Sequence, residues 1–437
     1  MSKFSITKVK SRWILDSRGK PTVETDIWAG DVMARAAVPS GKSTGENEAV
    51  ELRDGGKEFL GSHVSKAVSN VNDIIGPAII GMECNKQDEL DNFMIKELDK
   101  TPTKSKLGAN AILSVSMAAA KLSAQLSHLP LYEYLYTVKN KVTKPREDYL
   151  MPVPMSNVLN GGKHAGGDLA IQEFMIMPVG AKSMQQGIQM IAEVYAHLAK
   201  IIEKKYGHTS INVGDEGGFA PKIDKTQQAL DVILEAIQRA GFDPNTDVVL
   251  AIDAAATSFY ENGKYKIDGT MKTPDELIDY YVDLINTYPI KSFEDPFEEN
   301  DFDSFAALTK KVKAKCQIVD DDLTVTNTKI LEKAIKMGSG NSLLLKVNQI
   351  GSLTEAFAAA DMSYKNDYSV VVSHRSGETC DNTIADIAVA LCSGFIKTGA
   401  PCRSERNSKY NQLLRIAEEL GYKAKYPKSF SDWKQFL

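Results

Sequence analysis

Short apolar runs recur through the C-terminal half of the chain, and each stops at one charged or polar residue followed by a turn signal. Stretches of about the length of a βα unit separate the runs, so the pattern predicts strands that alternate with helices in a parallel sheet. The runs are VVLAIDAAA, IKSFEDPF, QIVDDDLT, LLLKVNQIG, VVVSHRSG and SGFIKTGA. They stop at Asp253, Glu294, Asp321, Lys346, His374 and Lys397.

In a parallel β/α barrel, the side chains at the C-terminal ends of the strands converge on one pocket. A single acid after a strand is usually a solvated loop residue or a helix cap, but six successive runs of this kind are hard to explain by caps alone. Carboxylates suit Mg²⁺, and a nearby lysine can act as a base. We therefore predict an α/β fold in which a TIM-like, eight-stranded β/α barrel over residues 141–437 carries a metal-assisted acid/base site.

The first part of the chain has a different pattern. Alternation in PTVETDIW and MARAAV, broken by turn signals, predicts an antiparallel meander. GANAILSVSMAAAKLSAQL has apolar residues at helical spacing, and the charged segment KNKVTKPREDY is typical of a linker. We predict an N-terminal α+β cap domain over residues 1–140.

Two barrel helices have clear boundary signals. Thr273, Pro274 and Glu276 combine a cap, a proline at the first helical position and a capping-box acid. Ser183 and Gly207 bracket a second amphipathic stretch.

Charge and composition narrow the class of protein. The 437 residues carry a net charge of −5 with no basic block, which argues against nucleic acid as a primary partner. The opening MSKFSITKVK lacks an apolar signal core, and no apolar stretch is long enough to cross a bilayer. Five cysteines without a C-x-x-C pair indicate neither a disulfide framework nor a zinc knuckle. We expect a soluble, cytoplasmic protein with no membrane partner.

Two glycine-rich segments, PSGKSTGENEA and NGGKHAGGDLAIQEF, have neither the Walker spacing nor a dinucleotide-binding turn. They can act as lids over a ligand, with Ser43 and His164 as polar contacts, or can be plain surface loops. We predict a mobile loop over residues 39–46.

Glu173 and Glu216 form a further pair of acids. If they face each other, one stays protonated and can act as a general acid.

The chain resembles the enolase (phosphopyruvate hydratase) family from end to end. The segments that carry the resemblance are DSRGKPTVE, PSGKSTGENEAVELRDG, LAIQEFMI, GDEGGFAP, EDPF, DDLTVTN, LLLKVNQIGSLTE, SHRSGET and IKTGAP. The resemblance implies the reversible, Mg²⁺-dependent dehydration of 2-phosphoglycerate to phosphoenolpyruvate, with two Mg²⁺ ions per active site stabilising an enolate.

The resemblance also implies the roles of individual residues. Lys346 matches the base and Glu216 the acid, with Glu173 as the partner of Glu216 and His374 beside them. The matches to the metal ligands are Asp253, Glu294 and Asp321 for one ion and Ser43 for the second. The matches to the substrate contacts are Arg375 and Ser376 for the phosphate, Lys397 for the carboxylate, and Gly41, His164, Gln172 and Glu173 around the pocket.

Some positions depart from the commonest family pattern, namely Lys20, Lys42, Lys163 and Asp320, and none of them is a catalytic position.

Two other interpretations of the function stay open. One is a related acid/base enzyme of the mandelate racemase or muconate cycloisomerase kind, although the early barrel region carries INVGDEGG instead of the K-x-K pair that such enzymes tend to have. The other is a binding protein that has kept the fold and lost catalysis. The family resemblance implies a homodimer, with an octamer as the alternative.

Overall fold

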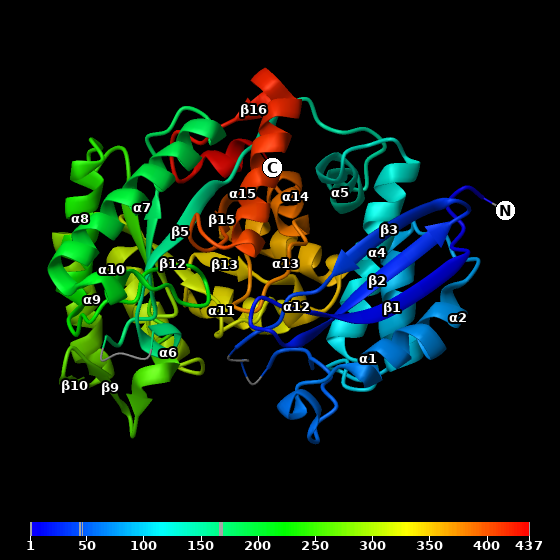
Figure 1. Ribbon diagram of the computed structural model, residues 1–437, viewed down its shortest axis with the longest axis horizontal. Helices are drawn as coiled ribbons and strands as arrows, with labels where there is room; N and C mark the ends of the chain where they lie inside the picture. Colours follow the sequence, from blue (N-terminus) through cyan, green and yellow to red (C-terminus); the bar gives the residue numbers. More distant parts are fainter. Residues whose placement is uncertain (1, 43–44, 46, 166–168, 437) are drawn as a thin grey trace.

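The computed structural model describes residues 2–42, 45, 47–165 and 169–436. Its N-terminal part is an antiparallel sheet with helices packed on it, at the right of Figure 1. The strands pair in the order β1 (Lys8–Leu15), β2 (Pro21–Ala29) and β3 (Val32–Ala37). α4 (Ala109–Leu126) packs on β2 and β3, and α5 (Leu131–Asn140) follows it. The shorter helices are α1 (Ser65–Ser69), α2 (Gly76–Ile79) and α3 (Gln87–Asn92). The predicted meander and the predicted helix are both confirmed.

The C-terminal part is a closed barrel surrounded by helices, which confirms the predicted fold class. All six apolar runs form barrel strands that end at the predicted residue or directly before it. The strands are β5 (Val153–Asn160), β6 (Glu173–Met177), β7 (Val249–Asp253), β11 (Ile290–Glu294), β12 (Gln317–Asp320), β13 (Ser342–Leu345), β14 (Ser369–Ser373) and β15 (Gly394–Lys397). The helices are α7 (Met184–Tyr206), α8 (Thr226–Arg239), α9 (Pro274–Thr287), α10 (Phe302–Val312), α11 (Thr328–Met337), α12 (Val347–Ile350), α13 (Leu353–Lys365), α14 (Thr383–Ala390) and α15 (Ser404–Leu420).

One strand breaks the expected parallel arrangement. β6 runs antiparallel to both of its neighbours, β5 and β7. Among the described residues of the connection from β5 to β6, the only regular element is the short helix α6 (Gly162–Ala165). A loop of this kind can join antiparallel strands, whereas parallel strands need a longer crossover, usually a helix. The expectation of a uniformly parallel sheet is therefore wrong at β6.

The helix boundaries follow the local signals. The Thr273 side chain accepts a hydrogen bond from the Glu276 backbone, and Glu276 reciprocates, so the predicted capping box is present at α9. The Ser183 side chain accepts from the backbone N–H of Gln186 and begins α7, and Gly207 ends it. Both predictions are confirmed because these signals act over only a few residues.

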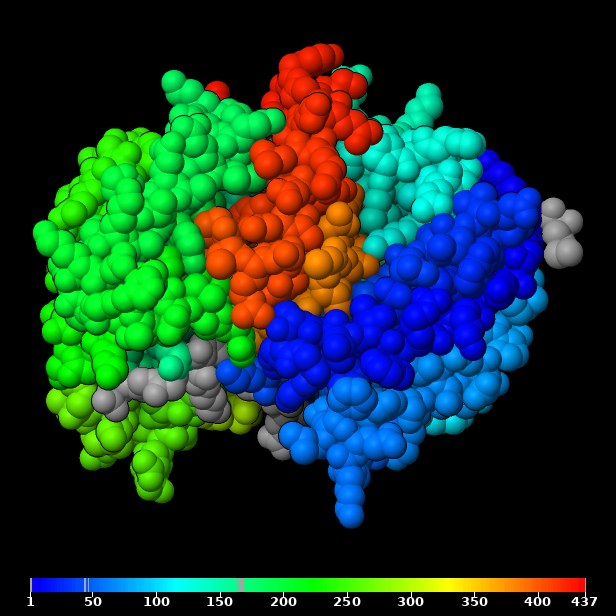
Figure 2. Space-filling view, viewed as in Figure 1, coloured from blue at the N-terminus to red at the C-terminus, as the bar shows by residue number. Residues whose placement is uncertain are grey.

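Smaller elements complete the chain. β4 (Tyr149–Leu150) pairs with β16 (Ala424–Lys425), and β8 (Tyr260–Glu261), β9 (Lys264–Ile267) and β10 (Thr270–Lys272) form a small separate sheet. On the face shown in Figure 2, the orange-red C-terminal helix lies between the green barrel helices and the N-terminal part. Within the described residues, no helix has the length and apolar character needed to span a membrane.

Asp320, one of the unusual positions, is fully buried in β12. Neither of its carboxyl oxygens has a hydrogen-bond partner among the described residues. A Cβ atom on Gly340 would lie 2.2 Å from Asp320 Oδ1, so the carboxyl group packs directly against the Gly340 backbone. Burial raises the pKa of Asp320 well above its ordinary value. The folded protein therefore keeps a proton that the unfolded chain releases.

We expect Asp320→Ala to stabilise the protein at neutral pH. The folded-state pKa is raised, so wild-type stability falls as pH rises above the ordinary aspartate value of about 4. Removing a buried carboxyl group without a partner should therefore increase the free energy of unfolding at pH 7 by about 1–3 kcal/mol, and the gain should shrink toward pH 4. Urea denaturation at several pH values measures the effect. The matched control is Asp279→Ala, an exposed aspartate on α9, and an equal gain at all pH values would contradict the explanation.

Candidate active site

The C-terminal ends of the parallel barrel strands and the N-terminal end of the antiparallel β6 surround a polar pocket. Ten of the predicted site residues line it, which are Gln172, Glu173, Glu216, Asp253, Asp321, Lys346, His374, Arg375, Ser376 and Lys397. Glu294 is not among the lining residues; it is fully buried and accepts from Lys397 Nζ. Gly41 is outside the lining, and Ser43 and the side chain of His164 lie outside the described residues. The predicted loop over residues 39–46 is likewise described only in part.

Lys397 is the cationic centre of one side of the pocket. Its Nζ atom donates to Asp253 Oδ2 at 2.9 Å and to the Glu294 oxygens at 3.0 and 2.9 Å. Glu173 Oε2 lies 3.2 Å away. Burial alone would lower the pKa of Lys397, but these carboxylates, Asp253 first, raise it well above its ordinary value. Lys397 is therefore a buried ammonium group.

Three carboxyl groups share this one ammonium, so they cannot all ionise at low cost. Burial, followed by the charge of Glu216, raises the pKa of Glu173 well above its ordinary value. Burial, followed by the charge of Asp253, raises the pKa of Glu294 well above its ordinary value in the same way. Both glutamates are therefore driven toward the protonated form, and the sharing of one proton between Glu173 and Glu216 stays a prediction.

Lys346 occupies the other side of the pocket, directly after β13. Its Nζ atom contacts Asp321 Oδ2, while Gln349 Nε2 donates to Asp321 Oδ1 at 2.9 Å. Burial favours the neutral amine of Lys346, but the Asp321 carboxylate outweighs burial and raises the pKa. The family resemblance also implies that adjacent Mg²⁺ ions lower the pKa of Lys346, and this stays a prediction.

Glu216 lies in the turn after Val213, which forms an isolated bridge with Phe219. Asn157 Nδ2 donates to Glu216 Oε2 at 3.1 Å. His374 Nε2 lies 3.5 Å from the same oxygen. Burial lowers the pKa of His374 to about 3, so the ring is neutral, and Arg406 Nη1 lies 2.7 Å from its Nδ1.

Arg375 holds a carboxylate with both ends of its guanidinium group. Nη1 donates to Glu48 Oε2 at 3.0 Å and Nη2 donates to Glu48 Oε1 at 3.1 Å. Nη1 also donates to Asn348 Oδ1 at 3.1 Å. This bidentate geometry is the one with which arginine binds phosphate groups as well as carboxylates.

Sequence reasoning missed several residues that build the site. Asp295 accepts hydrogen bonds at 3.0 Å from the backbone N–H groups of both Asp321 and Asp322. These three aspartates offer ligand atoms within 4.8 Å of one another. Burial and the Asp321 charge raise the pKa of Asp322 to about 7. In the sequence, Asp295 and Asp322 are marked only by standing next to another acid, in EDPF and DDLT. Nothing in the sequence marks Glu48 or Gln349 as site residues.

Lys42 forms an ion pair near the pocket. Its Nζ atom donates to Asp215 Oδ2 at 3.0 Å, next to Glu216 in the chain, and both side chains are partly exposed.

A pocket at one end of a barrel that combines several carboxylates with two buried lysines is typical of enzymes that use acid/base chemistry, often assisted by a metal ion. Its donor set suits Mg²⁺, since all the acidic ligands are carboxylate oxygens. Two family descriptions match the chain: "Enolase, N-terminal domain" over residues 6–135 and "Enolase, C-terminal TIM barrel domain" over residues 148–432. The chain belongs to the enolase family.

Individual relatives agree over almost their whole length. An enolase of Thermococcus gammatolerans is 55% identical over 426 residues, which cover 97% of each chain. An enolase of Pyrococcus furiosus is 54% identical over 419 residues, 95% of each chain, and one of Methanocaldococcus jannaschii is 54% identical over 420 residues, 96% of each chain.

Proposed function

We propose that this pocket carries out the reversible dehydration of 2-phosphoglycerate to phosphoenolpyruvate, with Lys346 as base and Glu216 as acid. The observation that carries the proposal is the placement of buried cationic groups, Lys346, Lys397 and Arg375, among carboxylates in one pocket. A strongly anionic substrate requires such cations, and the carboxylates supply the ligands for metal ions.

In the proposed reaction, Lys346 Nζ takes the proton from C2 of the substrate, and the Glu216 carboxyl group gives a proton to the departing hydroxyl group at C3. The proton acceptor must be the neutral amine. Burial favours that form, and the Asp321 carboxylate opposes it. Lys346 therefore becomes a better base when the negative charge of Asp321 is shared with another cation.

The other residues of the pocket bind and orient the substrate. Arg375 and Ser376 are proposed to hold the phosphate group and Lys397 the carboxylate. Glu173 is proposed as the partner of Glu216, and the neutral His374 lies beside Glu216. Gln172, Gly41 and His164 complete the proposed surroundings of the substrate.

We propose two Mg²⁺ ions per active site, one held by Asp253, Glu294 and Asp321 and the second by Ser43. The acids fit this role because the buried ammonium groups of Lys397 and Lys346 already contact all three of them. When bound, the metal ions offset the charge that builds on the substrate carboxylate.

The direct test follows the ultraviolet absorbance of the enol product after 2-phosphoglycerate is added with Mg²⁺. We expect absorbance to rise until equilibrium, and to fall when the reaction is started from phosphoenolpyruvate. The matched control is 3-phosphoglycerate, the positional isomer, which should give no change. No change in absorbance with 2-phosphoglycerate would indicate a binding protein without catalytic activity.

We also propose a cytoplasmic homodimer, with an octamer as the alternative, and a division into domains at residues 1–140 and 141–437. The free cysteines suit a reducing compartment. The segment between α5 and β4 has no helix or strand, which supports the proposed boundary. Light scattering after gel filtration measures the oligomeric state.

A further inference from the structure

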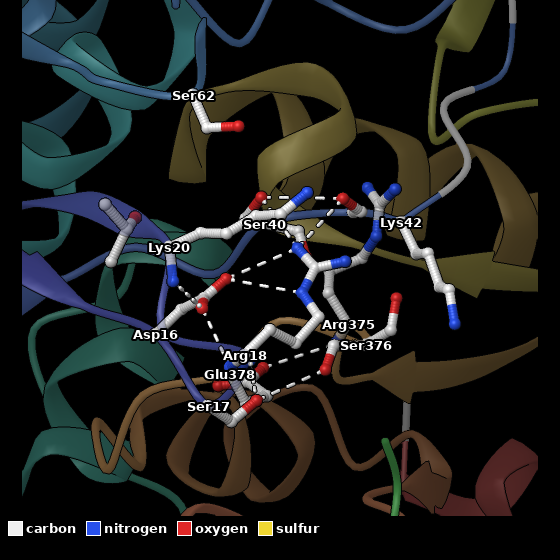
Figure 3. A network of polar contacts seen from close by, with 12 residues as sticks. Asp16, Ser17, Arg18, Lys20, Ser40, Lys42, Ser62, Arg375, Ser376 and Glu378 are labelled. Atoms are coloured by element: carbon white, nitrogen blue, oxygen red, sulfur yellow. Dashed lines mark hydrogen bonds and ion pairs between the residues drawn. The ribbon is translucent and has the colours of Figure 1, made fainter. Parts of the chain in front are cut away.

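The DSRG turn, residues 16–19, joins β1 to β2 and lies against the barrel segment that follows β14 (Figure 3). It is part of the DSRGKPTVE motif, which contains none of the predicted site residues. The Ser17 backbone N–H donates to the Glu378 carbonyl at 2.8 Å, and the Glu378 N–H donates to Ser17 Oγ at 3.2 Å. The turn thus connects the N-terminal sheet to the segment that carries Arg375 and Ser376.

The side chain of Arg18 is nearly buried, with 10% of its surface exposed. Its Nη2 atom donates to the Ser40 carbonyl at 3.3 Å, to Ser40 Oγ at 3.2 Å and to the Gly41 carbonyl at 3.1 Å. Asp16 Oδ2 accepts from the same guanidinium group at 3.3 and 3.4 Å. Asp16 Oδ1 accepts from the backbone N–H groups of Arg18 and Lys20, so Asp16 also fixes the shape of the turn.

The residues that Arg18 holds are paired directly with the barrel segment. Ser40 and Gly377 exchange both backbone hydrogen bonds, at 2.7 and 2.9 Å. Arg406 donates to the carbonyls of Arg375 and Ser376, both at 2.6 Å. The main chain from Arg375 to Gly377 is therefore packed against two guanidinium groups, those of Arg18 and Arg406, while the Arg375 and Ser376 side chains line the pocket.

Gly377 is the point of closest approach. A Cβ atom there would lie 2.4 Å from Arg18 Nη2 and 2.5 Å from Asp16 Oδ2. Gly377 does not have a positive φ, so the need for glycine at this position comes from space and not from backbone conformation. The guanidinium and carboxylate groups occupy the volume that any side chain would need.

We propose that the Arg18–Asp16 pair is a positioning element for the phosphate end of the substrate. It aligns the start of the loop at Ser40 and Gly41 with Arg375 and Ser376, so that recognition of the phosphate group depends on it. Arg18 itself lines no part of the pocket, and it acts through the main chain of its neighbours. This inference rests on the proposed function, which assigns Arg375 and Ser376 to the phosphate.

Two variants disturb the pair from opposite sides. Arg18→Lys keeps the positive charge beside Asp16 but lacks the planar guanidinium group that contacts Ser40 and Gly41 at the same time. Gly377→Ala keeps the pair and adds a methyl group where no space exists. Both variants should raise the KM for 2-phosphoglycerate by about tenfold, the equivalent of one hydrogen bond to a charged group, with a smaller change in kcat. Their effects should be less than additive in the double variant, because they act on one contact.

A role in maintaining the fold alone would not distinguish between ligands, and the test uses this difference. Inhibition constants are measured for inorganic phosphate and for 3-hydroxypropionate, which has the carboxylate but no phosphate group. We expect the constant for inorganic phosphate to rise about tenfold in both variants and the constant for 3-hydroxypropionate to stay unchanged. Equal losses for both ligands, or no loss for either, would overturn the inference.

Two further variants separate this inference from the function on which it rests. Arg375→Met should abolish inhibition by inorganic phosphate, and if it does not, the assignment of Arg375 to the phosphate is wrong. If Arg375→Met has this effect while Arg18→Lys and Gly377→Ala have none, only the positioning role is wrong. Arg239→Met removes an exposed ion pair on α8 and should leave all these constants unchanged. Circular dichroism and urea denaturation confirm that each variant is folded.

Discussion

Lys346→Ala is expected to lower kcat by about 10²–10⁴-fold, the usual contribution of a general base. It should also stop the exchange of the C2 hydrogen of 2-phosphoglycerate with solvent deuterium, because no other described amine lines the pocket except that of Lys397, which is bound to Asp253 and Glu294. Nuclear magnetic resonance of the recovered substrate measures exchange, and absorbance measures product.

Glu216→Gln separates the acid from the base. The proton at C2 can still move to Lys346, but the amide cannot protonate the departing hydroxyl group. We therefore expect exchange to persist while product formation falls by about 10²–10⁴-fold. The glutamine keeps the size of the side chain and can still pair with Asn157, so the pocket should keep its shape.

The control for the base variant is Lys104→Ala. Lys104 is also a buried lysine in an ion pair, with Glu355 at 3.0 Å, but it lies outside the pocket. Its removal should leave both exchange and kcat close to the wild-type values. Exchange that survives in Lys346→Ala would show that the base lies elsewhere.

Removing divalent metal with a chelator is expected to abolish turnover, and adding Mg²⁺ should restore it. The pocket gathers more carboxyl groups than ammonium groups, and a trianionic substrate adds further negative charge, so like charges would repel one another without added cations. Mg²⁺ should also raise the midpoint of urea denaturation in the absence of substrate, because a ligand that binds only the folded state stabilises it.

Variants of the acids test which of them hold the metal. Glu294→Gln and Asp321→Asn should each raise the Mg²⁺ concentration needed for half-maximal activity and for half-maximal stabilisation. Asp283→Asn, at an exposed position of α9, is the matched control and should change neither. Asp322→Asn distinguishes the proposed set from the cluster of Asp295, Asp321 and Asp322. A larger effect of Asp322→Asn than of Glu294→Gln would move the metal to that cluster. Full activity in metal-free buffer would contradict the proposal altogether.

Much of the fold could be read from the chain because its signals are local. The six apolar runs became barrel strands with the predicted ends, since a buried strand followed by a polar turn is specified within about ten residues. The capping box at Thr273 is equally local. The orientation of β6 could not be read in this way, because an apolar run has the same pattern whether its neighbour in the sheet is parallel or antiparallel.

The pocket residues that could be identified from the sequence are likewise those with a local signal. Asp253, Glu294, Asp321, Lys346 and Lys397 were found because each stands where a strand ends. Glu48, Gln349 and Arg18 were not assigned to the site, because each reaches it through a contact with a residue far away in the chain. For example, Glu48 meets Arg375 across 327 positions of sequence.

The sequence by itself determined the fold class, the family and the candidate acids and bases of this protein, since these follow from hydrophobic periodicity, residue chemistry and short motifs. The tertiary structure decided which of these groups are charged and to what they are bound. It places Lys397 between Asp253 and Glu294 and pairs Asp321 with Lys346. It also buries Asp320 where its carboxyl oxygens have no hydrogen-bond partner among the described residues. The physical reason is that pKa values and ion pairs depend on burial and on distances of a few ångströms between residues that the chain brings together only when it folds.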